Sequence, residues 1–145
     1  MFKKVGSFVF TSFKYYCVVH CVTEHVADIF LCSGDSMEPS FHSGDLVIIQ
    51  RFSKMVNSVD KGDVIIAKSP EEYEKFIMKR VKAVDGQMVR RGINYQLVPK
   101  GSVWLEGDNH TNSRDSWDFG PVPKGLIHGR VICRIWPLSY FSMKI

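Results

Sequence analysis

The sequence predicts a mainly β domain, with antiparallel strands in a folded-sheet or barrel-like arrangement, preceded by a membrane-associated helix. Three observations lead to this prediction. Beyond residue 44, short apolar runs rich in β-branched residues alternate with turn-forming residues. Helical periodicity is hard to find in that part of the chain. The first 23 residues, in contrast, are largely apolar and contain no acidic side chain.

The composition narrows the class of protein. The chain has 145 residues, the size of one ordinary domain, and 45% of them are apolar, which is enough for a hydrophobic core. With 23% charged residues, the chain is not of the disordered type. The net charge is only +4, and no basic cluster is interleaved with aromatic residues. We therefore expect no nucleic-acid partner.

The cysteines show neither a metal-binding nor a disulfide pattern. They are Cys17, Cys21, Cys32 and Cys133. No pair is of the C-x-x-C type, and no set of cysteines and histidines has zinc spacing. We interpret them as small apolar residues, and we expect neither a metal ion nor a disulfide framework.

Residues 1–31 form the predicted membrane-associated segment, and residues 32–145 form the predicted β-rich domain. Between Val5 and Thr23 the only formal charge is Lys14, so this stretch approaches the roughly 20 residues that span a bilayer. A central lysine costs about 2.5–3.5 kcal/mol in a span, although snorkelling relieves part of this cost.

A spanning anchor, a basic interfacial helix and a cleaved targeting segment are three interpretations of this stretch. A helix buried in the β-rich domain is a fourth. No A-x-A-like cleavage site follows, which disfavours a cleaved secretory signal. We therefore favour an anchor or an interfacial helix.

Short runs of apolar and β-branched residues predict the strands. These are residues 45–51, 63–68, 75–84, 87–91, 95–98, 102–108 and 127–138. Asp85 and Gly86 predict a two-residue hairpin turn that joins the strands 75–84 and 87–91. Residues 99–101 and 121–125 are rich in proline, glycine and lysine, and we interpret them as turns.

Lys79 lies among apolar residues in the strand 75–84. One face of this strand carries Ile77, Lys79, Val81 and Ala83, and the other carries Met78, Arg80, Lys82 and Val84. If the first face is buried, desolvation lowers the pKa of the Lys79 ammonium and makes its amine a candidate general base. The alternatives are a snorkelling lysine and a register that is shifted by one residue. Lys68, at the end of another strand, is a weaker candidate.

Ser36 lies in the stretch GDSMEPSF, residues 34–41, and is a candidate nucleophile. The same composition is typical of a plain polar turn. A serine becomes nucleophilic only when a base accepts its proton, and histidine is the usual base. Five histidines are present: His20, His25, His42, His110 and His128. His20 and His25 lie in the N-terminal helical region, and the other three have no acidic partner evident by spacing. All five stay open, because the members of a triad need not be close in sequence, but Lys79 has the more suitable surroundings.

Four sequence blocks occur in an order that resembles the type I signal peptidase family, the Ser–Lys membrane proteases. They are GDSMEPSF with GDLV, IMKRV with DG, GDNHTNSRDS, and FGPV. They cover most of the chain, from about residue 32 to residue 138. The short length and the stretches GDN, HGR and IWPL resemble the mitochondrial inner membrane branch of the family, and its first subunit type more than its second. The basic, acid-poor N-terminus suits mitochondrial import.

The resemblance implies a signal peptidase fold in which Ser36 is the nucleophile and Lys79 the general base. The backbone N–H of Ser36 would supply one oxyanion-hole donor. Some bacterial relatives add a serine hydroxyl at the position of Gly34, so the second donor is left open here between a backbone group and a water molecule. Met37 and Pro39 would shape the turn and the substrate groove.

The resemblance also implies a set of supporting residues. Ser113 matches the serine whose hydroxyl orients the lysine amine. Asp115 matches an acid that pairs with an arginine, for which Arg80 is the candidate partner. Asp108 and Asn109 would have structural roles near the site.

The implied function is that of a membrane-bound serine endopeptidase that removes presequences or sorting signals from proteins delivered to the mitochondrial intermembrane space. It would need no cofactor and no metal. It would contact membrane lipid, face the intermembrane space from the inner membrane, and form a heterodimer with a homologous second subunit. A soluble Ser–His hydrolase and a non-catalytic β module that partners an active subunit are the alternatives.

Overall fold

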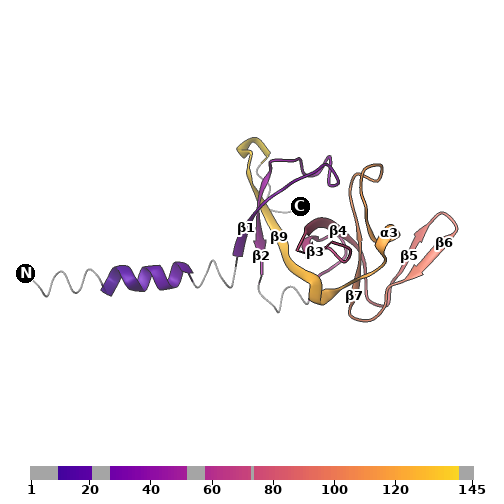
Figure 1. Cartoon of the computed structure of the whole chain (residues 1–145), viewed down its shortest axis with the longest axis horizontal. Helices are drawn as coiled ribbons and strands as arrows, with labels where there is room; N and C mark the ends of the chain where they lie inside the picture. Colours follow the sequence, from indigo (N-terminus) through magenta and orange to yellow (C-terminus); the bar gives the residue numbers. More distant parts are fainter. Residues whose placement is uncertain (1–9, 21–26, 52–57, 73, 141–145) are drawn as a thin grey trace, which may run out of the picture.

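The computed structural model describes residues 10–20, 27–51, 58–72 and 74–140 (Figure 1). Residues 10–20 form a helix whose side chains are all exposed, as the sequence predicts for the N-terminus. Within the described ranges, no helix is both long enough and apolar enough to cross a membrane. The rest of the stretch on which the membrane prediction depends, residues 1–9 and 21–26, lies outside the described residues.

The body of the molecule is a curled, antiparallel, seven-stranded sheet with the order β1-β2-β9-β3-β4-β7-β8 (Figure 1). Its strands are β1 (Ala27–Leu31), β2 (Leu46–Gln50), β3 (Val64–Lys68), β4 (Phe76–Val84), β7 (Ser102–Glu106), β8 (Val122–Pro123) and β9 (Ile127–Trp136). A separate two-stranded sheet pairs β5 (Met88–Arg91) with β6 (Asn94–Leu97). The predicted mainly β fold is confirmed.

Three short helical elements complete the described fold. They are α3 (Ser116–Phe119), η1 (Lys124–Leu126) and η2 (Leu138–Tyr140). The sequence predicts only turns for residues 121–125, where the structure has β8 and most of η1. A two-residue strand and a single helical turn are too short to show a periodicity in the sequence. Val122 in β8 is fully buried, opposite Val103 of β7.

The hydrophobic core lies on both faces of the central strand β3. Val64 and Ile66 pack into a cluster that includes Met37, whereas Ile65 and Ala67 pack into a second cluster. Successive side chains of a strand point to opposite faces, so the burial of residues 64–67 of β3 requires cover on both sides. Met37 ties the loop after β1 to the first cluster.

The sheet begins earlier than the predicted boundary between residues 31 and 32. Ala27–Leu31 form β1, which pairs along its whole length with β2. Ile29 and Leu31 are exposed on this edge strand, so its sequence looks like a continuation of the apolar N-terminal stretch. The strand β1 therefore lies on the N-terminal side of the predicted boundary, and the division of the chain into an anchor segment and a catalytic domain stays a prediction.

The predicted hairpin between residues 75–84 and 87–91 is wrong. The turn itself forms, because Gln87 N–H donates to the Val84 carbonyl at 3.0 Å. However, β4 already pairs with β3 along one edge and with β7 along the other. The strand β5 pairs with β6 instead, in the separate two-stranded sheet.

Candidate active site

Lys79 lies on the buried face of β4, as the period-two pattern predicts. Only 4% of it is exposed, and Val81 and Ala83 are buried in the same row. Burial lowers the pKa of the Lys79 ammonium from its ordinary value of 10.5, and the negative charges of Asp115 and Asp118 oppose this shift. Desolvation prevails, so the neutral amine is favoured relative to a lysine in water.

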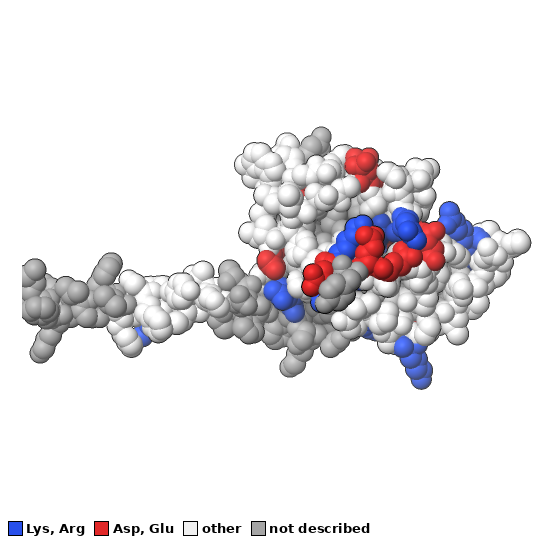
Figure 2. All heavy atoms as spheres, viewed as in Figure 1, with Lys and Arg blue, Asp and Glu red and all other residues white. Residues whose placement is uncertain are grey.

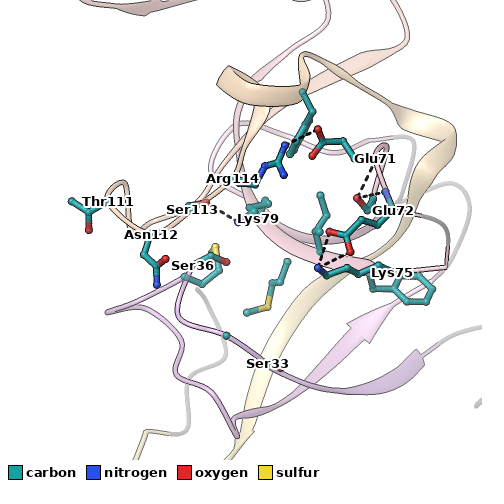
Figure 3. Close-up of a pocket in the computed structure, with 17 residues that line it drawn as sticks. Ser33, Ser36, Glu71, Glu72, Lys75, Lys79, Thr111, Asn112, Ser113 and Arg114 are labelled. Carbon is teal, nitrogen blue, oxygen red and sulfur yellow. Dashed lines mark hydrogen bonds and ion pairs between the residues drawn. The ribbon is translucent and has the colours of Figure 1, made fainter.

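Ser113 is the hydrogen-bond partner of this amine. The Lys79 ammonium donates to the Ser113 hydroxyl, with 2.7 Å between Nζ and Oγ (Figure 3). Ser113 belongs to the loop between β7 and α3. The carboxylate of Asp115 caps α3 by accepting a hydrogen bond from the Trp117 N–H. The Asp118 carboxylate in turn accepts one from the Asp115 N–H. This capping box fixes the end of the loop that presents Ser113.

Ser36 is half-buried in the loop after β1, and Asn109 holds that loop in place. The backbone N–H of Asn109 donates to the Ser36 carbonyl at 3.1 Å, and the Asn109 side-chain amide donates to the Asp35 carbonyl at 3.1 Å. One residue therefore ties the Ser36 loop to the Ser113 loop, although 73 positions separate Ser36 from Asn109 in the sequence.

Gly107 lies where these two loops come closest. A Cβ atom at this position would overlap the Ser113 side chain and would stand 2.5 Å from the Ser36 carbonyl oxygen. No real Cβ contact is this short, so the loops can approach each other only around a glycine. Sequence reasoning assigned no role to this residue. The close approach is a property of the folded chain and leaves no local sequence signal.

Arg80 pairs with Asp108, and the predicted pairing with Asp115 is wrong. Arg80 Nε and Nη2 donate to the Asp108 carboxylate at 2.9 and 2.7 Å. The hydrogen bond to Asp108 is the main reason why the pKa of Arg80 is raised. Arg80 points to the face of β4 opposite Lys79, whereas Asp115 lies close enough to Lys79 to act on its pKa. The two groups are therefore on different sides of the strand.

One pocket of about 500 Å³ brings the candidate residues together (Figure 3). Ser36, Lys79 and Ser113 line it, together with Gly34 and Met37. Gly34 has a φ of +86°, which is the left-handed region that favours glycine, and it offers no hydroxyl to an oxyanion. Pro39 is not among the lining residues, so the predicted role of this residue in the groove is restricted to the turn.

This arrangement places a serine, a desolvated lysine amine and a second hydroxyl around one accessible space, which is the constellation needed for nucleophilic catalysis without histidine. Comparisons with known proteins identify the family of the chain. The family model for signal peptidase, peptidase S26, matches residues 5–94 and 90–136. The chain belongs to the signal peptidase family.

Relatives in this family come from mitochondria of animals, plants and fungi. The chain is 42% identical to mitochondrial inner membrane protease subunit 1 of Xenopus tropicalis and of Homo sapiens, over 89% of this chain and 81% of each relative. It is also 37% identical to mitochondrial inner membrane protease subunit 2 of Danio rerio, over 81% of this chain and 69% of the relative. The resemblance drawn from the motifs is confirmed.

None of the described histidines lines the pocket of this signal peptidase homologue. His128 packs against the rings of Phe30 and Phe76, and His42 borders a different pocket beside Asp45. His25 lies outside the described residues. Lys68 is exposed at the end of β3 and does not line the pocket.

The rim of the pocket is charged. Arg114 pairs with Glu71 at 2.8 Å, and Lys75 pairs with Glu72 at 2.8 Å. All four side chains line the pocket, and acidic and basic side chains lie next to one another on the face shown in Figure 2. These pairs are exposed, so they contribute little to stability.

The described residues contain no group of three or more potential metal ligands. Cys32 is buried near the pocket, and its burial raises the pKa of the thiol to about 11. This thiol is therefore a small apolar side chain and not a nucleophile at neutral pH.

Proposed function

We propose that this protein is a membrane-bound serine endopeptidase that removes presequences or sorting signals, with Ser36 as the nucleophile and Lys79 as the general base. The observation that supports this most directly is the buried Lys79 amine, hydrogen-bonded to Ser113, in a pocket that Ser36 also lines. The membership of the chain in the signal peptidase family supports the reaction class.

In the proposed reaction, the neutral Lys79 amine accepts the proton of the Ser36 hydroxyl as the oxygen attacks the scissile carbonyl carbon. The tetrahedral oxyanion accepts a hydrogen bond from the Ser36 backbone N–H. Lys79 then gives its proton to the leaving amine, and an acyl-enzyme forms. A water molecule, deprotonated by the same lysine, releases the acyl group and restores Ser36. The scheme uses no metal and no cofactor.

The proposed substrate is an extended peptide segment that lies along the pocket as an added strand. Apolar side chains of the pocket wall, Met37, Ile77, Met78 and Phe119, offer contacts for apolar residues of the substrate. The charged rim lies beyond this wall. Because the pocket is open to solvent, a peptide can enter without unfolding of the domain.

The proposed location is the mitochondrial inner membrane, with the catalytic domain facing the intermembrane space. The relatives described above are named as subunits 1 and 2 of a mitochondrial inner membrane protease. We extend both features to this chain: the N-terminal segment holds it at the membrane lipid, and a homologous second subunit is its partner. Carbonate extraction of isolated mitochondria tests the attachment, and full release of the chain would contradict it.

Mass spectrometry of precursor proteins tests the activity. Precursors of the intermembrane space are incubated with the wild-type chain in its native membrane complex, with Ser36→Ala, and with Ser33→Ala as a matched control. Ser33 is a neighbouring pocket serine that has no role in the scheme. We expect one shortened product from the wild type and from Ser33→Ala, and none from Ser36→Ala. Cleavage by Ser36→Ala would overturn the proposal.

A further inference from the structure

The β5–β6 hairpin has one face on the body and one face in solvent. Val89 packs on Ala83 of β4 and Trp104 of β7, close to Val98. The opposite face carries the neighbouring side chains Met88, Leu97, Arg90 and Tyr95, all of them exposed. The hairpin therefore projects from the body at the β7 end of the molecule (Figure 1).

The solvent face of this hairpin is unusually apolar. Met88, Tyr95 and Leu97 are more than half exposed, and Ile93 at the turn is 90% exposed. Arg90 lies over the Tyr95 ring, 5.3 Å from its centroid. Tyrosine, methionine and arginine are enriched in protein interfaces, whereas an aliphatic side chain gains nothing from full exposure at a turn.

The hairpin region is also uniformly basic. Residues 86–105 contain Arg90, Arg91 and Lys100 and no aspartate or glutamate. Figure 2 agrees, because its right-hand end, where Figure 1 places β5 and β6, shows white and blue atoms and no red ones. A complementary surface would therefore be apolar in the centre and acidic around it.

A cavity of about 640 Å³ opens behind the hairpin, between β6 and α3. Trp104, Trp117 and Asp118 are among the residues that line it, and the two indole rings meet edge to face at 5.0 Å. Arg91 lies over the Trp117 ring at 5.8 Å. Such an aromatic cavity can accept an anchoring side chain from another protein, which is the usual form of an interface hot spot.

We propose that the β5–β6 hairpin and the cavity behind it form the docking surface for the homologous second peptidase subunit. This inference rests on the proposed function, since that function includes the second subunit. It adds where on this chain the subunit binds and what chemistry it presents: an apolar patch with an acidic border and one side chain for the aromatic cavity.

The sheet order favours a protein over a lipid surface as the occupant. The N-terminal segment joins the body at Ala27, in the edge strand β1, whereas the hairpin packs near β7 at the other end of the seven-stranded sheet. A chain held at the membrane through its N-terminal segment presents the β1 end toward the bilayer. The hairpin then points toward other proteins.

Binding of the purified second subunit from the same organism tests the inference. Ile93→Asp places a carboxylate at the tip, and Arg90→Glu reverses a charge on the solvent face. Leu138→Asp is the matched control, because Leu138 is also an exposed aliphatic residue but lies in η2. We expect each hairpin variant to bind roughly tenfold more weakly or worse than the wild type, and the control to bind like the wild type. Both hairpin positions are exposed, and circular dichroism verifies that the variants remain folded.

The inference would be overturned if the wild-type pair did not associate, or if the hairpin variants associated with the second subunit as well as the control does. It would also be overturned if the hairpin variants lost binding to phosphatidylcholine–cardiolipin vesicles while their association with the second subunit stayed unchanged. Precursor cleavage is measured on the same complexes. A wild-type pair that associates but cuts nothing contradicts the proposed peptidase activity alone. A pair that cuts normally and ignores both hairpin substitutions contradicts the docking surface alone.

Discussion

The Lys79 ammonium and the Ser113 hydroxyl are joined by a hydrogen bond of 2.7 Å, across a separation of 34 residues. The bond limits the directions in which the amine can point. Lys79 is buried, and the Ser113 hydroxyl is a hydrogen-bond partner of its amine. Under the proposed mechanism, Ser113 acts through the lysine, as a positioning residue.

We expect Ser113→Ala to lower kcat for a presequence peptide by up to about a hundredfold, because a misplaced base loses much of its effect. The KM value should change little, since the substrate does not depend on this hydroxyl for binding. Ser33→Ala, on the same pocket wall, is the control. Equal kcat values for Ser113→Ala and the control would show that the Ser113 hydroxyl does not contribute to catalysis.

We expect Ser36→Ala and Lys79→Met each to abolish peptide cleavage while the domain stays folded. A nucleophile and its base act as one unit, so the double variant should be no worse than either single variant. Lys68→Met is the control, because Lys68 is an exposed lysine at the end of the neighbouring strand. Residual cleavage by Lys79→Met, together with loss of cleavage in a histidine variant, would favour a Ser–His mechanism.

The pH dependence follows from the lowered pKa of Lys79. Only the neutral amine accepts a proton, so kcat/KM should rise with pH along a limb whose midpoint lies below the ordinary value of 10.5. Stability should change in the same direction. The unfolded chain binds the proton more tightly, so the free energy of unfolding should rise as the pH passes from the folded to the unfolded pKa.

Two measurements check whether kcat/KM and the free energy of unfolding both rise with pH. The first is the pH profile of kcat/KM for the wild type and for variants with His42, His110 or His128 replaced by glutamine. The limb should remain in all of them. The second is the difference in unfolding free energy between the wild type and Lys79→Met across the same pH range. A limb that vanishes with one histidine would contradict the assignment.

The prediction from sequence succeeded where a single strand was enough to define the surroundings of a residue. Period two along residues 76–84 places Lys79 beside Val81 and Ala83 and opposite Arg80, and the structure has this pattern. The information is local, because side chains alternate along any strand. The mainly β class follows in the same way from several short runs of this kind.

Features that depend on the relative positions of two segments were not predictable in this way. Arg80 meets Asp108 and not Asp115, and this choice depends on the path of the loop between β7 and α3. Likewise, β5 pairs with β6 and not with β4, although a two-residue turn joins β4 to β5. Neither the loop path nor the choice of strand partner can be read from a local pattern, and one sequence without relatives offers no other signal.

Asp108 is expected to be important for stability. It pairs with Arg80 at 2.7 Å, and both side chains are largely buried. Burial alone raises the pKa of Asp108, but the hydrogen bond from Arg80 and the nearby positive charges outweigh burial and lower it overall. Asp108→Asn leaves the Arg80 charge without its counter-charge and should cost about 3 kcal/mol of unfolding free energy, the lower end for a broken buried pair.

Urea unfolding measures this cost, with Glu72→Gln as the control for an exposed ion pair. The pair should also make stability sensitive to acid. Since the pKa of Asp108 is lowered in the folded state, its contribution is complete above the ordinary value of 3.8 and is lost as the pH falls through the folded value. Equal unfolding free energies for Asp108→Asn and the wild type would show that the pair is energetically neutral.

Gly107→Ala tests whether the close approach of the two loops is required for activity. The added methyl group would collide with the Ser113 side chain and with the Ser36 carbonyl oxygen, and the latter cannot rotate away. One or both loops must therefore move, which displaces Ser113 from Lys79 and disturbs the backbone of the nucleophile. We expect a loss of kcat of about a hundredfold or more, with a destabilisation of roughly 1–3 kcal/mol from overpacking.

Gly125→Ala is the matched control, because a Cβ there would meet no atom within 4 Å and its φ lies outside the left-handed region. Peptide cleavage and thermal unfolding of the two variants decide the point: full activity of a folded Gly107→Ala would mean that the loops can separate without loss of the catalytic geometry.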